Sequence, residues 1–353
     1  MINQKLDEFL EKALVNYDLP GLAAGVSIGE NSRSEHAGLR HLGAKGYQDL
    51  AERKALKPEH IFHMASVTKL FVGTSIMKLA EQGKIDTEGH LTDYLPWFFM
   101  ADERYRQITI RQLLSHTSGM PDVEDYHWDR PETDDYALER YVRSKEVAEA
   151  HLLWDPAEGR FAYSNIGYEI LGVVIAAVSG IPFEAYVQKN IFEPLGMDDS
   201  TLLTFKRGIY EKDSPGSVDL CTPHEKNNAK EIVKTEHFPY NRAHGPSSTL
   251  TSNIIDIDKW GTAHLEKRIL KPETYEEVWA EQALVPNNGE HICLSWFKRE
   301  QNGYTLYGHE GTDDGFRASF WICPELELSI IICSNISNAP VKKISKQIFD
   351  LLT

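Results

Sequence analysis

Strand-like and helix-like patterns occupy different parts of this chain, and this separation restricts the possible folds more than any other feature. Apolar runs that predict strands lie near both ends, at 22–29, 291–298, 303–308, 316–323 and 328–335, with an Asn-Gly hairpin signal at 302–303. Helical periodicity dominates between them, at 67–82, 109–115, 136–150, 166–179 and 183–192. We therefore expect an α+β fold in which both ends of the chain build one antiparallel sheet, with an all-helical region inserted.

Each end of the chain also carries an apolar stripe with helical spacing, which predicts a helix that flanks the sheet. The two stripes consist of Leu6, Phe9, Leu10, Ala13 and Leu14, and of Val341, Ile344, Ile348 and Leu352. We expect a single domain, 1–353, made of an α/β subdomain (1–63 plus 246–353) and a helical subdomain (64–245). The polar segment 205–245 has no predicted structure, but a long surface excursion of this kind can border a site.

The four cysteines lack the Cys-x-x-Cys spacing of metal and redox sites. If residues 324–327 turn a hairpin, Cys323 lies opposite Leu328 and Cys333 lies opposite Ala318. The two sulfurs are then too far apart along the ladder to form a disulfide. We expect free thiols in a reducing compartment.

The net charge excludes several kinds of partner. The chain has 37 basic and 53 acidic residues, a net charge of −16. Such a surface repels phosphate backbones and anionic lipid headgroups, so neither nucleic acid nor a membrane is an expected partner. Asp7, Glu8 and Glu11 interrupt the apolar run that a signal peptide needs, and the longest apolar stretch, 170–178, is shorter than the roughly 20 residues that span a bilayer. These features favour the cytoplasm.

The first candidate for chemistry is the Ser-x-x-Lys spacing of Ser66 and Lys69, at the start of a predicted helix. Residues three apart share a helical face, and a lysine kept neutral by burial can take the proton of the serine hydroxyl. The spacing alone is weak evidence, because Ser75 and Lys78 repeat it within the same helix. An N-capping serine and a solvated lysine are the structural alternative.

Two further candidates lie downstream. Tyr163-Ser164-Asn165 offers a phenol for proton relay and an amide for substrate binding, although a simple helix cap explains the same residues. His309-Glu310-Gly311 follows a predicted strand, where glycine would let a ligand approach and the Thr312 N–H could point into a cleft. Similar His-x-Gly strings at 36–38 and 41–43 show that this motif also selects nothing by itself.

Several other patterns are read as structural. Residues 25–29 match Gly-x-Ser-x-Gly, but Ser27 falls inside a predicted strand instead of on a strand–turn–helix elbow. His60 and His63 have no nearby acidic or cysteine ligands, so we expect no zinc site. The string at 113–119 reads as a helix end and a turn, and the acidic pair at 313–314 as turn residues.

Taken in order, ASVTK (65–69), YSN (163–165) and HEG (309–311) resemble the three active-site motifs of the penicillin-recognising serine hydrolases. The likeness is to the branch that holds class C β-lactamases, penicillin-binding proteins, D-stereospecific peptidases and family VIII carboxylesterases. Connecting segments at 19–29, 78–86, 94–98, 108–121, 245–261 and 330–335 resemble the family too, so the likeness covers nearly the whole chain outside 205–245. The fold that it implies is a β-lactamase/DD-peptidase-like fold.

The resemblance also implies a mechanism. Ser66 would be the nucleophile, Lys69 its base and Tyr163 the proton relay, while the N–H groups of Ser66 and Thr312 would form the oxyanion hole. Asn165 would orient the carbonyl or amide side of the substrate. The implied mechanism requires no metal and no organic cofactor.

One departure from the family pattern bears on the substrate. β-Lactamases carry Lys-Thr-Gly as the third motif, and its ammonium and hydroxyl receive a carboxylate, whereas this chain has His309 and Glu310 there, with His309, Glu310 and Gly311 as substrate-binding candidates. A neutral imidazole is a poorer anchor for an anion than an ammonium, and Glu310 would repel a carboxylate if its side chain faces the cleft. We therefore predict a serine hydrolase of small neutral or cationic esters or amides, in the first place a carboxylesterase, with weak or no β-lactamase activity. Arg317 would restore anion binding if it reaches the cleft. The alternatives are a D-amino-acid peptidase or amidase, a β-lactamase, and a non-catalytic ligand sensor on the same fold.

Overall fold

The computed structural model describes residues 2–204 and 219–353, so part of the polar excursion expected at 205–245 lies outside the described residues. Its centre is a nine-stranded sheet in the order β3-β2-β1-β13-β12-β11-β10-β9-β8, with antiparallel pairing throughout. The strands are β1 (Gly21–Ile28), β2 (Arg40–Asp49), β3 (Lys54–Ala55), β8 (Ala283–Leu284), β9 (His291–Ile292), β10 (Phe297–Gln301), β11 (Tyr304–Asp313), β12 (Phe316–Cys323) and β13 (Leu328–Ser334). The N-terminal β1 pairs with the C-terminal β13, which confirms a sheet built from both ends of the chain.

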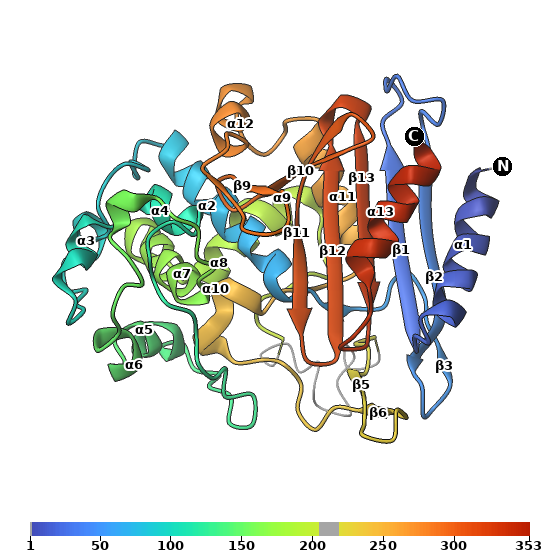
Figure 1. Cartoon of the computed structure of the whole chain (residues 1–353), viewed down its shortest axis with the longest axis horizontal. Helices are drawn as coiled ribbons and strands as arrows, with labels where there is room; N and C mark the ends of the chain where they lie inside the picture. The colour runs from blue at the N-terminus through green and yellow to red at the C-terminus, as the bar shows by residue number, and fades with distance from the viewer. Residues whose placement is uncertain (1, 205–218) are drawn as a thin grey trace.

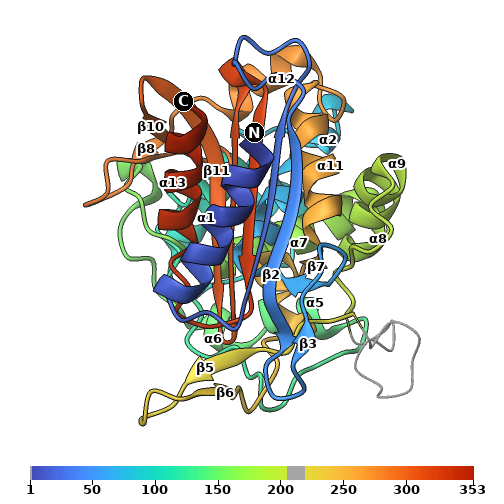
Figure 2. The same ribbon diagram turned by 90° about the vertical axis from the view of Figure 1, so that its right-hand side faces the viewer.

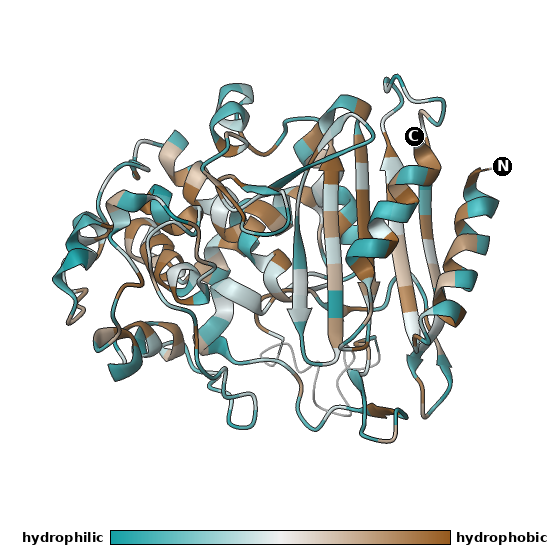
Figure 3. Ribbon diagram, in the orientation of Figure 1, coloured by the Kyte–Doolittle hydropathy of each residue, from teal (hydrophilic) through white to brown (hydrophobic). Residues whose placement is uncertain are grey.

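Helices cover both faces of this sheet (Figures 1 and 2). The terminal helices α1 (Ile2–Asn16) and α13 (Val341–Leu352) lie on one face, and α11 (Ile254–Leu265) packs on the other. Successive residues of β13 alternate between two cores: Ile330 and Ile332 pack with the terminal helices, whereas Ile331 and Cys333 pack on the α11 side. Hydrophilic and apolar residues alternate along α1 and α13, as expected of helices with one buried face (Figure 3).

The remaining helices form a layer beside the sheet, on the left of Figure 1. They are α2 (Thr68–Glu81), α3 (Leu91–Tyr94), α4 (Ile110–Leu114), α5 (Ala137–Val142), α6 (Lys145–Ala148), α7 (Asn165–Ser179), α8 (Phe183–Val187), α9 (Glu193–Leu195), α10 (Gly245–Ser248) and α12 (Pro272–Val278). Shorter elements include η1 (Ala65–Val67), η5 (Arg242–His244) and the strand pairs β4 (Phe62–His63) with β7 (Thr251–Ser252) and β5 (His224–Lys226) with β6 (Ile232–Lys234). Mixed helix and antiparallel sheet confirm the expected α+β class.

Both predicted hairpins form. Asn302 and Gly303 have φ values of 52° and 79°, the left-handed pair that a two-residue turn requires. In the β12–β13 ladder, Cys323 pairs with Leu328 and Cys333 with Ala318, and all four cysteines are free and buried. The predicted register therefore holds.

Two elements predicted to be continuous, one strand and one helix, are each interrupted. The run 291–298 is not one strand: β9 and β10 pair with each other, and Ser295, at φ 72°, lies in the turn between them. There the Ser295 N–H donates to the carbonyl of Leu114, a tertiary contact that the apolar pattern does not reveal. The helix expected over 136–150 is two helices, because the Ser144 side chain caps the start of α6.

Within the described residues, no single helix has the length and apolar composition needed to cross a membrane. The bent pair Asn165–Ser179 and Phe183–Leu195 meets the test only when the two helices are counted together across a 71° bend. Much of α7 is buried against neighbouring helices.

Candidate active site

Ser66 lies in η1, a short 3-10 turn that leads into α2. The preceding residue, Ala65, has φ 47°, a left-handed conformation that costs energy for a residue with a Cβ. Gly311 of β11 packs against this turn, where any Cβ would overlap the backbone carbonyl of Met64. The glycine expected to admit a ligand therefore serves first to bring β11 against the segment that carries Ser66.

Lys69, one helical turn after Ser66, is completely buried. Its Nζ donates to Ser66 Oγ at 3.0 Å, to Asn165 Oδ1 at 2.6 Å and to the carbonyl of Ser247 at 2.8 Å. Burial lowers the pKa of Lys69 to about 8, because desolvation outweighs the nearby carboxylates. At this pKa roughly a tenth of the amine is neutral at pH 7, far more than for an ordinary lysine, which makes it a competent base for the Ser66 hydroxyl.

Tyr163 approaches Ser66 from the segment before α7, and its phenol hydrogen-bonds with the Ser66 side chain. Burial raises the pKa of Tyr163 well above its usual value, so the phenol keeps its proton and can donate it. The ring stacks on His116 at 4.2 Å between centroids, and His116 Nδ1 accepts from the N–H of Ser164 at 3.1 Å. His116, expected only to close a helix, therefore also fixes the ring of Tyr163.

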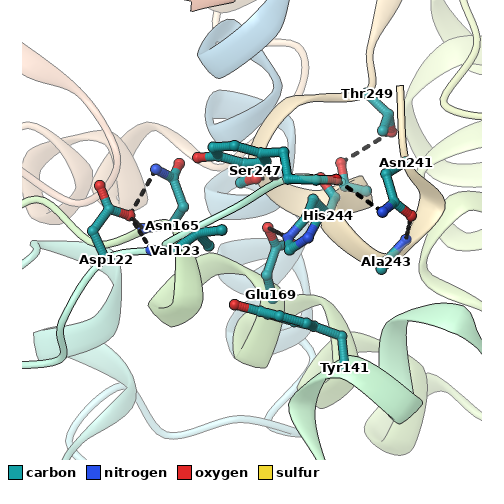
Figure 4. A network of polar contacts seen from close by, with 12 residues as sticks. Asp122, Val123, Tyr141, Asn165, Glu169, Asn241, Ala243, His244, Ser247 and Thr249 are labelled. Carbon is teal, nitrogen blue, oxygen red and sulfur yellow. Dashed lines mark hydrogen bonds and ion pairs between the residues drawn. The ribbon is translucent and has the colours of Figure 1, made fainter. Parts of the chain in front are cut away.

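Asn165 begins α7 and links Lys69 to a carboxylate. Its Oδ1 accepts from Lys69, while its Nδ2 and its backbone N–H both donate to Asp122 Oδ1 at 2.8 Å (Figure 4). Ser164 accepts from the N–H of Gly167, so the expected helix cap forms as well. The Oδ1 and Nδ2 atoms of Asn165 thus both have protein partners. A substrate can use only the second N–H of Nδ2 and the second lone pair of Oδ1.

The third motif lies within β11 and not after it, because this strand continues to Asp313. β10 pairs only with residues 304–308, so the edge of β11 from His309 onward is open on that side. His309 lines the cavity but is only 2 % exposed. Its Nδ1–H donates to the carbonyl of Glu310 at 2.6 Å, and its buried Nε2 has no hydrogen-bond partner among the described residues. Burial lowers the pKa of His309 to about 3, so the ring is neutral.

Glu310 points to the opposite face of the sheet from Gly311. Its Oε1 accepts from Ser319 Oγ at 3.1 Å and from Trp321 Nε1 at 2.7 Å, both side chains of β12. Burial raises the pKa of Glu310. Glu310 is still one of the residues that line the cavity.

These residues share a cavity of about 560 Å³ that includes Ser66, Tyr163, Asn165, His309, Glu310 and Thr312. The structure therefore brings together every residue expected at the site except the buried Lys69 and Gly311, which contact it from behind. Carboxylates outnumber cations in the wall: Glu290, Glu310, Asp313 and Asp314 against Arg317 and Lys342. Lys342 pairs with Glu290 at 2.6 Å, and Arg317 reaches the cavity but donates to the carbonyls of Asp313 and Phe316.

The competing patterns have structural roles. Ser75 Oγ donates to the carbonyl of Phe71 in mid-helix, and Lys78 donates to the carbonyl of Ile269. Ser27 lies within β1. His63 contacts Asp313 at 2.7 Å, so Asp313 does more than turn the chain. Over 2–204 and 219–353, no group of three or more histidine, cysteine or acidic side chains is arranged to hold a metal ion.

Sequence reasoning missed Asp122 and the carbonyl of Ser247, which complete the surroundings of Lys69. Asp122 follows a turn, and Ser247 acts through its backbone, so neither carried a motif. Only the polar character of the segment near 245 hinted that it borders the site.

The family follows from the fold and the site together. The β-lactamase family model matches residues 2–353. The chain belongs to this family, whose fold is that of serine hydrolases of the penicillin-binding-protein type.

Among curated relatives, protein flp of Staphylococcus aureus (strain MW2) is 26% identical, over 97% of this chain and 64% of its own length. Penicillin-binding protein 4* of Bacillus subtilis (strain 168) is 26% identical over 70% of this chain and 54% of its own. The chain thus spans less than two thirds of the curated relatives that it matches.

Two solved structures share the fold. An octameric penicillin-binding protein homologue from Pyrococcus abyssi superposes with a TM-score of 0.82 at 24% identity, covering 100% of this chain and 77% of that one. D-amino acid amidase from Ochrobactrum anthropi SV3 gives 0.80 at 21% identity, covering 99% and 97%.

Proposed function

We propose that this chain is a carboxylesterase that cleaves small neutral or cationic esters through an acyl-enzyme on Ser66. The observation that carries the proposal is the buried amine of Lys69, 3.0 Å from Ser66 Oγ and with its pKa lowered to about 8, behind a cavity that Ser66 lines. An N-capping serine with a solvated lysine would show neither the burial nor this contact.

The residues divide the reaction between them. Ser66 Oγ attacks the ester carbonyl while its proton passes to Lys69 Nζ, and the N–H groups of Ser66 and Thr312 stabilise the oxyanion. As the C–O bond breaks, Tyr163 gives its proton to the leaving oxygen and recovers one from Lys69. Water then attacks the acyl-enzyme with the proton flow reversed, which releases the acid and restores Ser66.

The charges of the cavity favour neutral or cationic substrates over β-lactams, whose carboxylate needs a cation. The neutral ring of His309 supplies none, and Lys342 is paired with Glu290. Arg317 reaches the cavity, but the carboxylates of Asp313 and Asp314 beside it oppose its charge. We propose weak or no β-lactamase activity for this reason. The four free, buried thiols support a reducing compartment, and we propose the cytoplasm.

A D-amino acid amidase is the second candidate, and one observation favours it. His309 Nε2 is a buried acceptor with no partner in the described part of the chain, and the ring lies 6.2 Å from that of Tyr163, the proposed donor to the leaving group. An acceptor at this place suits a leaving group that carries N–H bonds. The fold is shared with an enzyme named as an amidase of D-amino acids.

A fluorophosphonate probe tests whether the chain is an enzyme of this type. Denaturing mass spectrometry is expected to show one adduct on Ser66 in the wild type and none in Ser66→Ala. Ser75→Ala is the matched control, because it has the same Ser-x-x-Lys spacing but should keep both adduct and activity. A wild type that forms no adduct would support the non-catalytic sensor instead.

A substrate panel then separates the hydrolase activities. We expect p-nitrophenyl esters of short acids to be turned over faster than nitrocefin, and Ser66→Ala to lower the rate by at least about 10³-fold. Nitrocefin turnover as fast as that of the esters contradicts the esterase proposal. Faster turnover of D-alanyl amides than of the esters establishes the amidase alternative.

A further inference from the structure

Two ionisable side chains lie fully buried behind Lys69, and the proposed mechanism uses neither of them. Glu169 is 0% exposed and His244 is 1% exposed. His244 Nδ1 lies 3.4 Å from Glu169 Oε1. In the described chain neither oxygen of Glu169 has a hydrogen-bond donor, so the imidazole is the counter-group of this carboxylate. A buried carboxylate is costly unless it serves as one half of a charge pair.

The pair links α7 to the continuous segment η5–α10, and these two parts of the chain supply the acceptors of Lys69 (Figure 4). Glu169 lies one turn after Asn165 on α7, and Asn165 Oδ1 accepts from Lys69. His244 ends η5, three residues before Ser247, whose carbonyl also accepts from Lys69 and whose hydroxyl donates to the carbonyl of His244 at 3.2 Å. A contact between Glu169 and His244 therefore fixes the spacing of the two acceptors.

The surroundings of the pair strengthen its electrostatic effect. The ring of His244 packs edge-on against Tyr141 at 4.4 Å and Tyr126 at 5.0 Å, so aromatic rings and not water surround the pair. In such a poorly polarisable environment a charge acts over a longer range than at the surface. Of the carboxylates that raise the pKa of Lys69, Glu169 has the largest effect.

We propose that Glu169 and His244 are positioning residues for Lys69: their contact holds Asn165 and Ser247 at the spacing at which both accept from Nζ, and the carboxylate of Glu169 stabilises the ammonium form of this amine. The inference rests on the proposed function of Lys69. Other groups also face this amine: Asp122 before α7, Asp313 and His309 on β11, His116 after α4, Tyr168 on α7, and Tyr163.

The test is the pH dependence of Ser66 labelling by a fluorophosphonate, followed by mass spectrometry. Labelling needs neutral Lys69, so the wild-type rate should rise with pH through about 8. Glu169→Gln removes a negative charge that stabilises the ammonium form. The acid limb, the rising part of the curve of labelling rate against pH, should therefore move to lower pH by about one unit. The plateau, the maximal rate at high pH, should fall because the base is weaker and less well held.

Glu184→Gln is the matched control, because Glu184 pairs with Arg242 of the same η5 at 2.6 Å but is not among the groups that affect Lys69. Its acid limb should stay at the wild-type pH, even if its stability falls. A purely structural role for Glu169 would lower the plateau without moving the limb, and that result overturns the proposal.

His244→Phe gives a second measurement should Glu169→Gln not fold. Phenylalanine fits among the aromatic rings, but it removes the contact that ties α7 to η5. The plateau of the labelling rate should therefore fall as in Glu169→Gln, while the limb should stay at the wild-type pH because Glu169 is still present. An unchanged plateau in a folded variant contradicts the positioning role alone, whereas a wild type that is unlabelled at every pH overturns this inference together with the proposed function.

Discussion

At the scale of single residues, chemistry is decided by surroundings and not by spacing. Ser66 and Lys69 have the same separation as Ser75 and Lys78, yet only Lys69 is fully buried and contacts its serine. The Ser75 hydroxyl donates a hydrogen bond to the carbonyl of Phe71 in its own helix, and Lys78 donates to the carbonyl of Ile269. The difference arises because α7 and α10 close over Lys69 and remove it from water, which lowers the pKa of its amine.

Gly311 provides a prediction at this scale. Gly311→Ala should lower the free energy of unfolding by about 1–3 kcal/mol and kcat/KM by about 10²-fold, because the new Cβ would push β11 away from the turn that carries Ser66. Gly167→Ala, within α7, is the control near the site, since its Cβ would meet Leu113 at 3.5 Å and Ser164 Oγ at 3.7 Å, both ordinary contacts. We expect this control to be as stable as the wild type or more so. Equal activity in the two variants would contradict the role of Gly311.

At the scale of elements, the start of α7 organises most of the site. Tyr163 precedes the helix and Ser164 is its N-cap. Asn165 is the first helical residue, and Glu169 follows one turn later. Ser164 Oγ accepts from the N–H of Gly167 and donates to the carbonyl of Pro121, so the cap also ties the helix to the segment that carries Asp122. A cap that served only helix stability would not need this second bond.

Ser164→Ala tests that double role. We expect it to lower the free energy of unfolding by about 1 kcal/mol, as measured by denaturant titration, and to lower kcat/KM as Asn165 shifts. Ser144→Ala removes the cap of α6 in the same way and should cost stability without loss of activity. The idea is wrong if the two variants have the same kcat/KM.

At the scale of the whole molecule, the sheet depends on segments from opposite ends of the chain. β1 pairs with β13, and α1 and α13 cover the same face, so neither end completes a core without the other. Cys323 and Cys333 lie in β12 and β13, whereas Cys221 and Cys293 lie outside these strands in the larger core, and all four are buried. Burial raises the pKa of each thiol.

Thiol reactivity should therefore report global unfolding. We expect 5,5′-dithiobis(2-nitrobenzoate) to modify no cysteine rapidly in the native protein and all four in denaturant, with or without prior reduction. Rapid modification of a native thiol, or fewer than four free thiols after unfolding without reductant, would show that the packing or the redox state differs from this account.

The sequence by itself determined the α+β class, the terminal helices, the β12–β13 register and the three motifs, because period, turn residues and spacing are local properties of the chain. The same local signals failed where a contact between distant segments determines the local structure. A hydrogen bond from Ser295 to Leu114 interrupts a predicted strand, and a glycine is required at 311 because the backbone of Met64 lies against it. Only the tertiary structure buried Lys69, placed Glu310 on the far face of β11, and brought Asp122, His116, Glu169 and His244 to the site. Burial and charge proximity depend on segments far apart in sequence, and these two quantities set the pKa values on which the proposed chemistry depends.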